Sequence, residues 1–146
     1  MRVNIITHHT NGAGLQKDST LLTNILELNG HVVNKIQHND PRLRAVAMPP
    51  EFMADVSFFL EVVSERGMRF SRRNILVPNC EFWNEQSWGH LSGRFDYVLC
   101  KTADCLSIWT DKVGPAKCID LGWEAEDLYD PSIVRERKFL HLGGKG

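Results

Sequence analysis

The feature that most constrains the fold is a regular alternation of short, β-branched apolar segments with segments of helical pattern. The segments that we expect to form strands are residues 2–7, 31–38, 55–63, 74–78, 95–101 and 116–123. Between them, apolar residues recur at helical spacing from Leu21 to Leu28 before Gly30, and Thr102 precedes a second helical segment that ends before Gly114. Strands connected through helices are typical of βαβ units, whose strands lie parallel. The sequence therefore predicts an α/β fold, a Rossmann-like three-layer sandwich with a mostly parallel sheet.

The size and charge of the chain argue against several classes of function. Its 146 residues suit one domain with a sizeable core. With 24% charged residues and a formal net charge of −1, it lacks the basic character of proteins that bind nucleic acids or anionic membranes. Its apolar runs are too short to cross a bilayer, and its first residues read as a strand and not as a signal peptide. We expect a cytoplasmic protein with no nucleic-acid partner and no membrane span, for which peripheral association with a membrane stays open.

The cysteines and histidines do not have the spacing of a metal site. The cysteines, which form no CxxC pair, are Cys80, Cys100, Cys105 and Cys118. We expect them to be free thiols in a reducing compartment. His8 and His9 are adjacent, and neighbouring residues of a strand point to opposite faces. The sequence therefore predicts no bound metal, and we expect no cofactor.

Polar and charged residues gather directly after the expected strands. HHTNGAG follows the first strand, Glu61 lies near the end of the third, PNCEFWNE follows the fourth, and Lys101 ends the fifth. A parallel sheet binds ligands outside the carboxyl ends of its strands, where the strand order reverses. These segments therefore predict a ligand site at one edge of the sheet.

The first of these segments, THHTNGAGLQKDST, is open to two interpretations. Gly12, Ala13 and Gly14 would let the backbone approach a ligand closely, and the start of the following helix favours anions. The same residues would also make a plain turn into a helix that Asp18 or Ser19 can cap. A lysine stands where a dinucleotide-binding fingerprint carries its third glycine, which argues against NAD.

The segment NILVPNCEFWNEQSW combines amides and carboxylates with aromatic rings. Sugars need directional partners for their hydroxyl groups and flat rings for their C–H faces. Asn79 and Glu81 beside Trp83 and Trp88 therefore suit a sugar site. The alternative is a solvated loop whose tryptophans anchor it to the core.

Three more polar residues have a structural interpretation beside the functional one. Glu61 lies near the end of an apolar strand, so its carboxylate must be paired or must face a cleft. Thr102 can cap the helix that follows it. Lys101 is placed to meet a phosphate or a carboxylate.

Together, the motifs resemble a known family. DVSFFLE, NILVPNCEFW and FDYVLCKT, then GW followed by acidic residues and finally FLHLGGKG, occur in an order that resembles bacterial GT-B-type glycosyltransferases, which use nucleotide sugars. The resemblance covers most of the chain.

The resemblance implies a function and a domain organisation. GT-B enzymes have two Rossmann-like domains that face a cleft, with the acceptor (a glycan, a lipid or another molecule) mainly on the first domain and the nucleotide-sugar donor mainly on the second. Residues 1–137 would be the acceptor-side domain, and residues 138–146 the first strand and glycine loop of the second. We expect that the C-terminal donor domain is missing from this chain, and that the chain alone is an incomplete, inactive glycosyltransferase.

The same resemblance assigns roles to individual residues. The loop of Gly12, Ala13 and Gly14 would face the donor diphosphate and the transferred sugar. The residues that line the cleft or its rim would be Asn79, Glu81, Lys101 and Thr102, and the donor-phosphate loop would be Gly143, Gly144 and Lys145.

The identity of the catalytic base stays open among His8, His9 and Glu81. The stereochemistry of transfer stays open with it. Two other functions are alternatives: a non-catalytic Rossmann-like binding or interaction module, and a nucleotide-dependent oxidoreductase.

Overall fold

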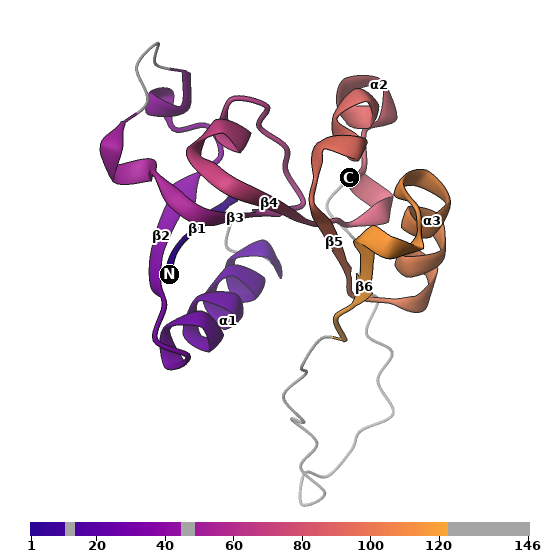
Figure 1. The fold of residues 1–146 in the computed structure, drawn as a ribbon, viewed down its shortest axis with the longest axis horizontal. Coiled ribbons are helices and arrows are strands. Elements are labelled where there is room, and N and C mark those ends of the chain that lie inside the picture. Colours follow the sequence, from indigo (N-terminus) through magenta and orange to yellow (C-terminus); the bar gives the residue numbers. More distant parts are fainter. Residues whose placement is uncertain (11–13, 45–48, 123–146) are drawn as a thin grey trace, which may run out of the picture.

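The computed structural model describes residues 1–10, 14–44 and 49–122. Its six strands form one sheet in the order β2-β1-β3-β4-β5-β6, and every neighbouring pair is parallel (Figure 1). The strands are β1 (Arg2–Thr7), β2 (Val32–Gln37), β3 (Ala54–Leu60), β4 (Ser71–Val77), β5 (Tyr97–Cys100) and β6 (Cys118–Asp120). The predicted α/β, Rossmann-like fold is therefore confirmed.

The start of β4 differs from the prediction. The strand begins at Ser71 and not at Asn74, because Ala54 of β3 already pairs with Ser71, and Val56 with Arg73. Arg73 is exposed. Solvent-facing polar side chains carry no apolar signal, so the hydrophobic pattern alone misses these first residues of the strand.

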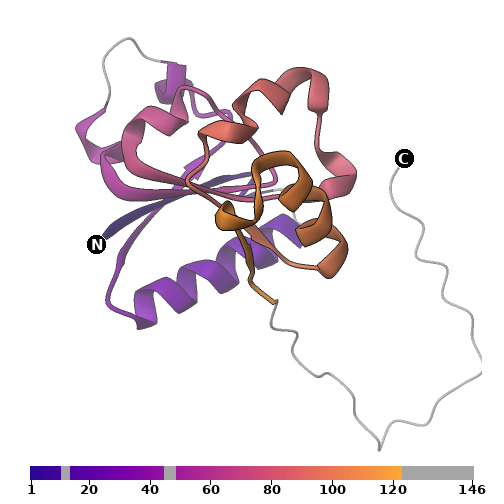
Figure 2. The same cartoon turned by 45° about the vertical axis from the view of Figure 1, so that its right-hand side comes forward.

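Helices cover both faces of the sheet. Helix α1 (Gly14–Leu28) packs on one face and α3 (Ala103–Val113) on the other, which gives three layers (Figure 2). The short α2 (Glu85–Trp88) and several 3₁₀ turns complete the described structure, at Pro41–Arg44, Pro50–Phe52, Gly67–Phe70, Cys80–Phe82, Gly89–Arg94 and Pro115–Lys117.

The predicted cap is confirmed for α3 but is wrong for α1. Thr102 caps α3 as predicted, because its hydroxyl oxygen accepts a hydrogen bond from the Cys105 amide at 3.2 Å. Helix α1 begins at Gly14, so Asp18 and Ser19 lie inside it and the predicted caps are wrong there. Both of these side chains are engaged in contacts with distant residues instead.

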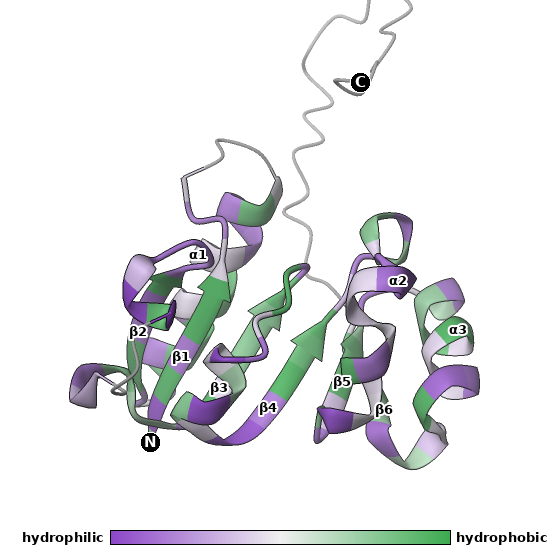
Figure 3. Cartoon of the chain, turned by 90° about the horizontal axis from the view of Figure 1, so that it is seen from above, coloured by the Kyte–Doolittle hydropathy of each residue, from purple (hydrophilic) through white to green (hydrophobic). Residues whose placement is uncertain are grey.

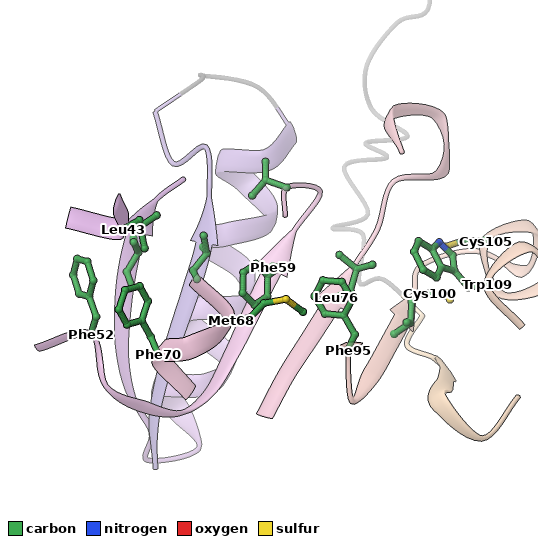
Figure 4. Packing of buried hydrophobic residues seen from close by; sticks show 14 residues of the cluster. Leu43, Phe52, Phe59, Met68, Phe70, Leu76, Phe95, Cys100, Cys105 and Trp109 are labelled. Carbon is green, nitrogen blue, oxygen red and sulfur yellow. The ribbon is translucent and has the colours of Figure 1, made fainter. Parts of the chain in front are cut away.

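The core consists of two apolar clusters, one on each face of the sheet. Ile6, Phe59 and Leu76 face the α3 side, and their neighbours Ile5 and Phe58 face α1. Figure 3 shows apolar residues concentrated along β1, β3 and β4, and Figure 4 shows the α3-side cluster. Burial on both faces explains why the strands read as continuous apolar runs.

The strand order indicates where a ligand would bind to a sheet of this kind. From β1 the chain crosses to β2 on one side and then returns to β3 on the other, so the order reverses between β1 and β3. In open α/β sheets, the crevice outside the carboxyl ends of the strands at such a point is the usual place for a ligand.

Part of the prediction lies outside the described residues. This is true of the proposed second-domain start at 138–146, including Gly143, Gly144 and Lys145, and of Gly12 and Ala13. Within the described part of the chain, no helix is long and apolar enough to cross a membrane.

Candidate functional site

A cleft of about 600 Å³ lies over the carboxyl edge of the sheet at the point where the strand order reverses. Side chains that follow four strands line it: His8 after β1, Glu61 after β3, Asn79 after β4 and Lys101 after β5. Gly14, at the start of α1, also lines the cleft. The structure thus brings segments together at the edge that the sequence predicted.

A second hollow of about 530 Å³ adjoins the cleft, and Asn79 and Lys101 line both. Glu81 and Thr102 contribute to the second hollow. The hydroxyl of Thr102 is used as the helix cap, and the side chain of Asn79 accepts a hydrogen bond from the Glu81 amide at 3.2 Å. These residues shape the rim of the site.

Lys101 links three elements at the floor of the cleft. Its Nζ donates to Asp18 Oδ2 of α1 at 2.9 Å and to Glu61 Oε1 after β3 at 3.2 Å. The three side chains are largely buried, at 20%, 20% and 13% exposure for Lys101, Asp18 and Glu61. Burial lowers the pKa of Lys101, but the two carboxylates outweigh it and the net shift is upward. Lys101 is therefore a charged strut between α1 and the sheet.

Glu61 has an unusual backbone. Its φ of 58° is the only positive φ of a non-glycine residue among those described, in a region that a glutamate rarely adopts. The sheet holds it there, because the Glu61 amide donates to the Val77 carbonyl at 3.0 Å and Thr7 Oγ1 donates to the Leu60 carbonyl at 2.9 Å. This backbone directs the carboxylate to Lys101 and the cleft.

Aromatic side chains form one wall, and they divide into two roles. Phe82, which is 68% exposed, and Trp88 line the cleft. Trp83 packs its ring 4.7 Å from the buried Trp109, centroid to centroid, and donates from Nε1 to Glu85 at 2.7 Å. Trp83 therefore anchors the loop, while Phe82 and Trp88 face the space where a ligand would lie.

The predicted base candidates lie in different surroundings. His8 lines the cleft, with its ring centroid 4.0 Å from that of His38. Burial and, secondarily, the charge of His8 lower the pKa of His38, whose Nδ1 has no hydrogen-bond partner among the described residues. Sequence analysis did not single out His38. The pairing of Thr7 with Gln37 in neighbouring parallel strands would have placed it beside His8.

His9 turns away into the structure. Its Nε2 lies 3.0 Å from the Ile5 carbonyl, which can only accept, so Nε2 carries the proton and Nδ1 accepts from Ser19 Oγ at 2.7 Å. Its backbone amide donates to Gln37 at 2.9 Å. Burial lowers the pKa of His9, which favours this neutral form. Both ring nitrogens are thus committed to structural bonds, and Glu81 lies exposed at the second hollow.

The neutral His9 predicts a loss of stability in weak acid. Below about pH 6.5 the unfolded chain takes up a proton that folded His9 accepts only at lower pH, so unfolding is favoured as the pH falls. One such group contributes a slope of up to about 1.4 kcal/mol per pH unit. Urea unfolding at several pH values between 7.5 and 5.5 gives the free energy of unfolding at each. This free energy should depend less steeply on pH in His9→Asn than in the native chain. A further decrease is expected in His9→Asn/His38→Asn, and equal slopes in all three would contradict the assignment.

The comparisons with known proteins do not identify a function, so the geometry of the cleft is the basis for one. No protein-family model, curated protein or solved structure matches the chain. Within the described residues, no group of three or more histidine, cysteine or acidic side chains is arranged to hold a metal ion.

Proposed function

We propose that the cleft binds the sugar-containing acceptor of a glycosyltransferase that uses a nucleotide-sugar donor. One observation carries the proposal: carboxylate, amide and aromatic side chains from separate segments line one cleft where the order of a parallel sheet reverses. The ordered motifs that resemble GT-B glycosyltransferases support it. In that family a second domain supplies the donor site.

The groups in the cleft match the surface of a sugar. Asp18, Glu61 and Asn79 offer oxygen acceptors for hydroxyl groups, and Asn79 also offers donors. Phe82 and Trp88 offer ring faces for the apolar C–H side. A cleft with a few directional polar groups and aromatic walls is typical of small-molecule sites.

The charge of the cleft favours the acceptor over the donor phosphates. Lys101 is balanced by two carboxylates, Asp18 and Glu61, within hydrogen-bond distance. This group carries a net charge of about −1 when all three are ionised, which repels a diphosphate. Lys101 therefore serves better as an organiser of the acceptor side than as a phosphate ligand.

His8 is the best-placed base for such a transfer. The acceptor hydroxyl must lose a proton as it attacks the sugar, and the histidine that takes it must reach the cleft with a free nitrogen. His8 lines the cleft, whereas the ring of His9 is bonded to Ser19 and Ile5. Glu81 in the second hollow is the other candidate on this proposal.

Sugar binding can be tested on the chain by NMR titration with methyl glycosides of glucose, galactose, mannose and N-acetylglucosamine. At least one should shift the resonances of cleft residues. Phe82→Ala should weaken its binding about five- to tenfold, because a stacked ring contributes about 1 kcal/mol. Met53→Ala is the matched control, since Met53 is also an exposed apolar side chain but does not line the cleft.

Two results would contradict the proposal. One is that no glycoside perturbs the cleft, and the other is that Phe82→Ala and Met53→Ala bind alike. Transfer is tested in a protein that includes a donor domain, by the release of nucleoside diphosphate from UDP- and GDP-sugars. Sugar binding without such release would favour a non-catalytic binding module.

A further inference from the structure

All four cysteines of the chain lie in one region of the α3-side core, although they are far apart in sequence. They come from four segments: Cys80 opens the turn after β4, Cys100 ends β5, Cys105 lies in α3 and Cys118 begins β6. All are free thiols. Figure 4 shows Cys100 and Cys105 beside Trp109. Their sequence spacing gives no sign of this gathering.

Within this region, Cys80 and Cys105 form a pair with different exposure. Cys100 and Cys105 belong to the buried α3-side cluster, and Cys80 packs against that cluster. Cys80 is half-buried, and both it and Cys105 line the second hollow beside the cleft. Cys100 is fully buried. A small oxidant that enters the hollow therefore meets Cys80, the more exposed of these two lining thiols, before Cys105.

The reactivities of the buried thiols fit this order. Burial raises the pKa of Cys105 above its ordinary value, and burial also raises that of Cys100. A protonated thiol is a poor nucleophile towards peroxide, because the thiolate is the reacting species. Cys105 is thus suited to react second, with a sulfur that is already oxidised.

We propose that Cys80 and Cys105 are an oxidant-responsive pair that closes to a disulfide beside the cleft when hydrogen peroxide is present. Peroxide oxidises the Cys80 thiolate to a sulfenic acid, and its O–O bond breaks with loss of hydroxide, which takes up a proton to become water. The sulfur of Cys105 then attacks the Cys80 sulfur, and a second water leaves as the S–S bond forms and the Cys105 proton is transferred. Two thiols are oxidised by two electrons, and one peroxide is reduced to two waters.

The disulfide would act on the cleft through the turn Cys80–Phe82. This turn carries Glu81 to the second hollow and Phe82 to the cleft wall. A bond from its first residue to α3 fixes the turn against the helix. The disulfide can form whatever the cleft binds, and mass spectrometry detects the S–S bond without any ligand.

The test is oxidation of the folded, reduced chain with a tenfold excess of hydrogen peroxide, followed by alkylation, digestion and mass spectrometry without reductant. The expected product is a linked peptide pair that contains Cys80 and Cys105, and dithiothreitol should reverse it. In Cys105→Ser, Cys80 should instead accumulate as a sulfenic acid, which dimedone traps. Cys118→Ser is the matched control and should form the disulfide to the same extent as the native chain.

Several outcomes would overturn the proposal. These are the absence of any disulfide in the folded chain, a linkage through Cys118 or Cys100 as the main product, or equal dimedone labelling of Cys80 in the native chain and in Cys105→Ser. If Cys105→Ser does not fold, as judged by circular dichroism, Cys80→Ser takes its place. This variant of a half-buried turn residue should then abolish the disulfide, and persistence of an intramolecular disulfide would contradict the pair.

Discussion

Replacement of Lys101 by methionine is expected to lower the free energy of unfolding by about 2–3 kcal/mol. The substitution keeps the aliphatic stem but leaves the Asp18 and Glu61 carboxylates without the ammonium group that lies 2.9 Å and 3.2 Å from them. Loss of one partner from a fully buried ion pair destabilises by about 3–5 kcal/mol, and the partial exposure of these groups reduces that effect. Urea unfolding at pH 7 measures the change.

Two variants show whether the effect comes from the buried network. Lys112→Met removes a lysine that pairs with the exposed Glu85, and it should change stability by less than about 1 kcal/mol. Lys101→Met combined with Glu61→Gln should regain part of the lost stability, because one uncompensated charge is removed. If Lys101→Met lowers the free energy of unfolding no more than Lys112→Met does, this would contradict the interpretation that Lys101 links α1 to the sheet.

Truncation of Trp109 to alanine is expected to lower the free energy of unfolding by about 4 kcal/mol. Trp109 is 0% exposed and lies at the centre of the contact between α3 and the loop that carries the aromatic wall. Its removal leaves a large cavity and takes away the surface on which Trp83 packs. Thermal and urea unfolding measure the loss.

Trp109→Phe separates packing from hydrogen bonding. The indole Nε1 of Trp109 is buried and has no partner among the described residues. Phenylalanine therefore gives up ring volume and no hydrogen bond, and the expected loss is about 1–2 kcal/mol. A loss as large as that of Trp109→Ala would mean that the indole N–H contributes to stability after all.

The fold could be predicted from the sequence because each strand is marked by a local sequence pattern. Each strand of a parallel sheet that is buried on both faces is a short apolar run, and each run here lies at or near its predicted place. The start of α1 was not accessible in this way. Asp18 and Ser19 have the residue types of helix caps, but their side chains bond to residues outside the helix. Asp18 pairs with Lys101, and Ser19 with His9.

Of the candidate site, only the location could be predicted from the sequence. Glu61, Asn79 and Lys101 follow predicted strands, and parallel strands must bring such residues to one edge. Which of them touch was not predictable, because Lys101 is 83 residues from Asp18 and 40 from Glu61 in sequence. These partners depend on the strand order, which local patterns do not contain.

The aromatic loop shows the same limit. The sequence left open whether the tryptophans of this loop anchor it or meet a ligand. The structure divides them, since Trp83 packs on Trp109 whereas Trp88 lines the cleft. Residue type alone cannot distinguish two tryptophans whose rings pack on each other when only one of them lines the cleft.

The left-handed backbone of Glu61 has a consequence for how the cleft would engage a ligand. A non-glycine residue in this conformation stores about 1–3 kcal/mol of strain, which the surrounding sheet must hold in the folded chain. The carboxylate is therefore positioned by folding, before any ligand arrives. A sugar that hydrogen-bonds to it would meet a rigid acceptor, and none of the binding free energy would be spent on ordering that side chain.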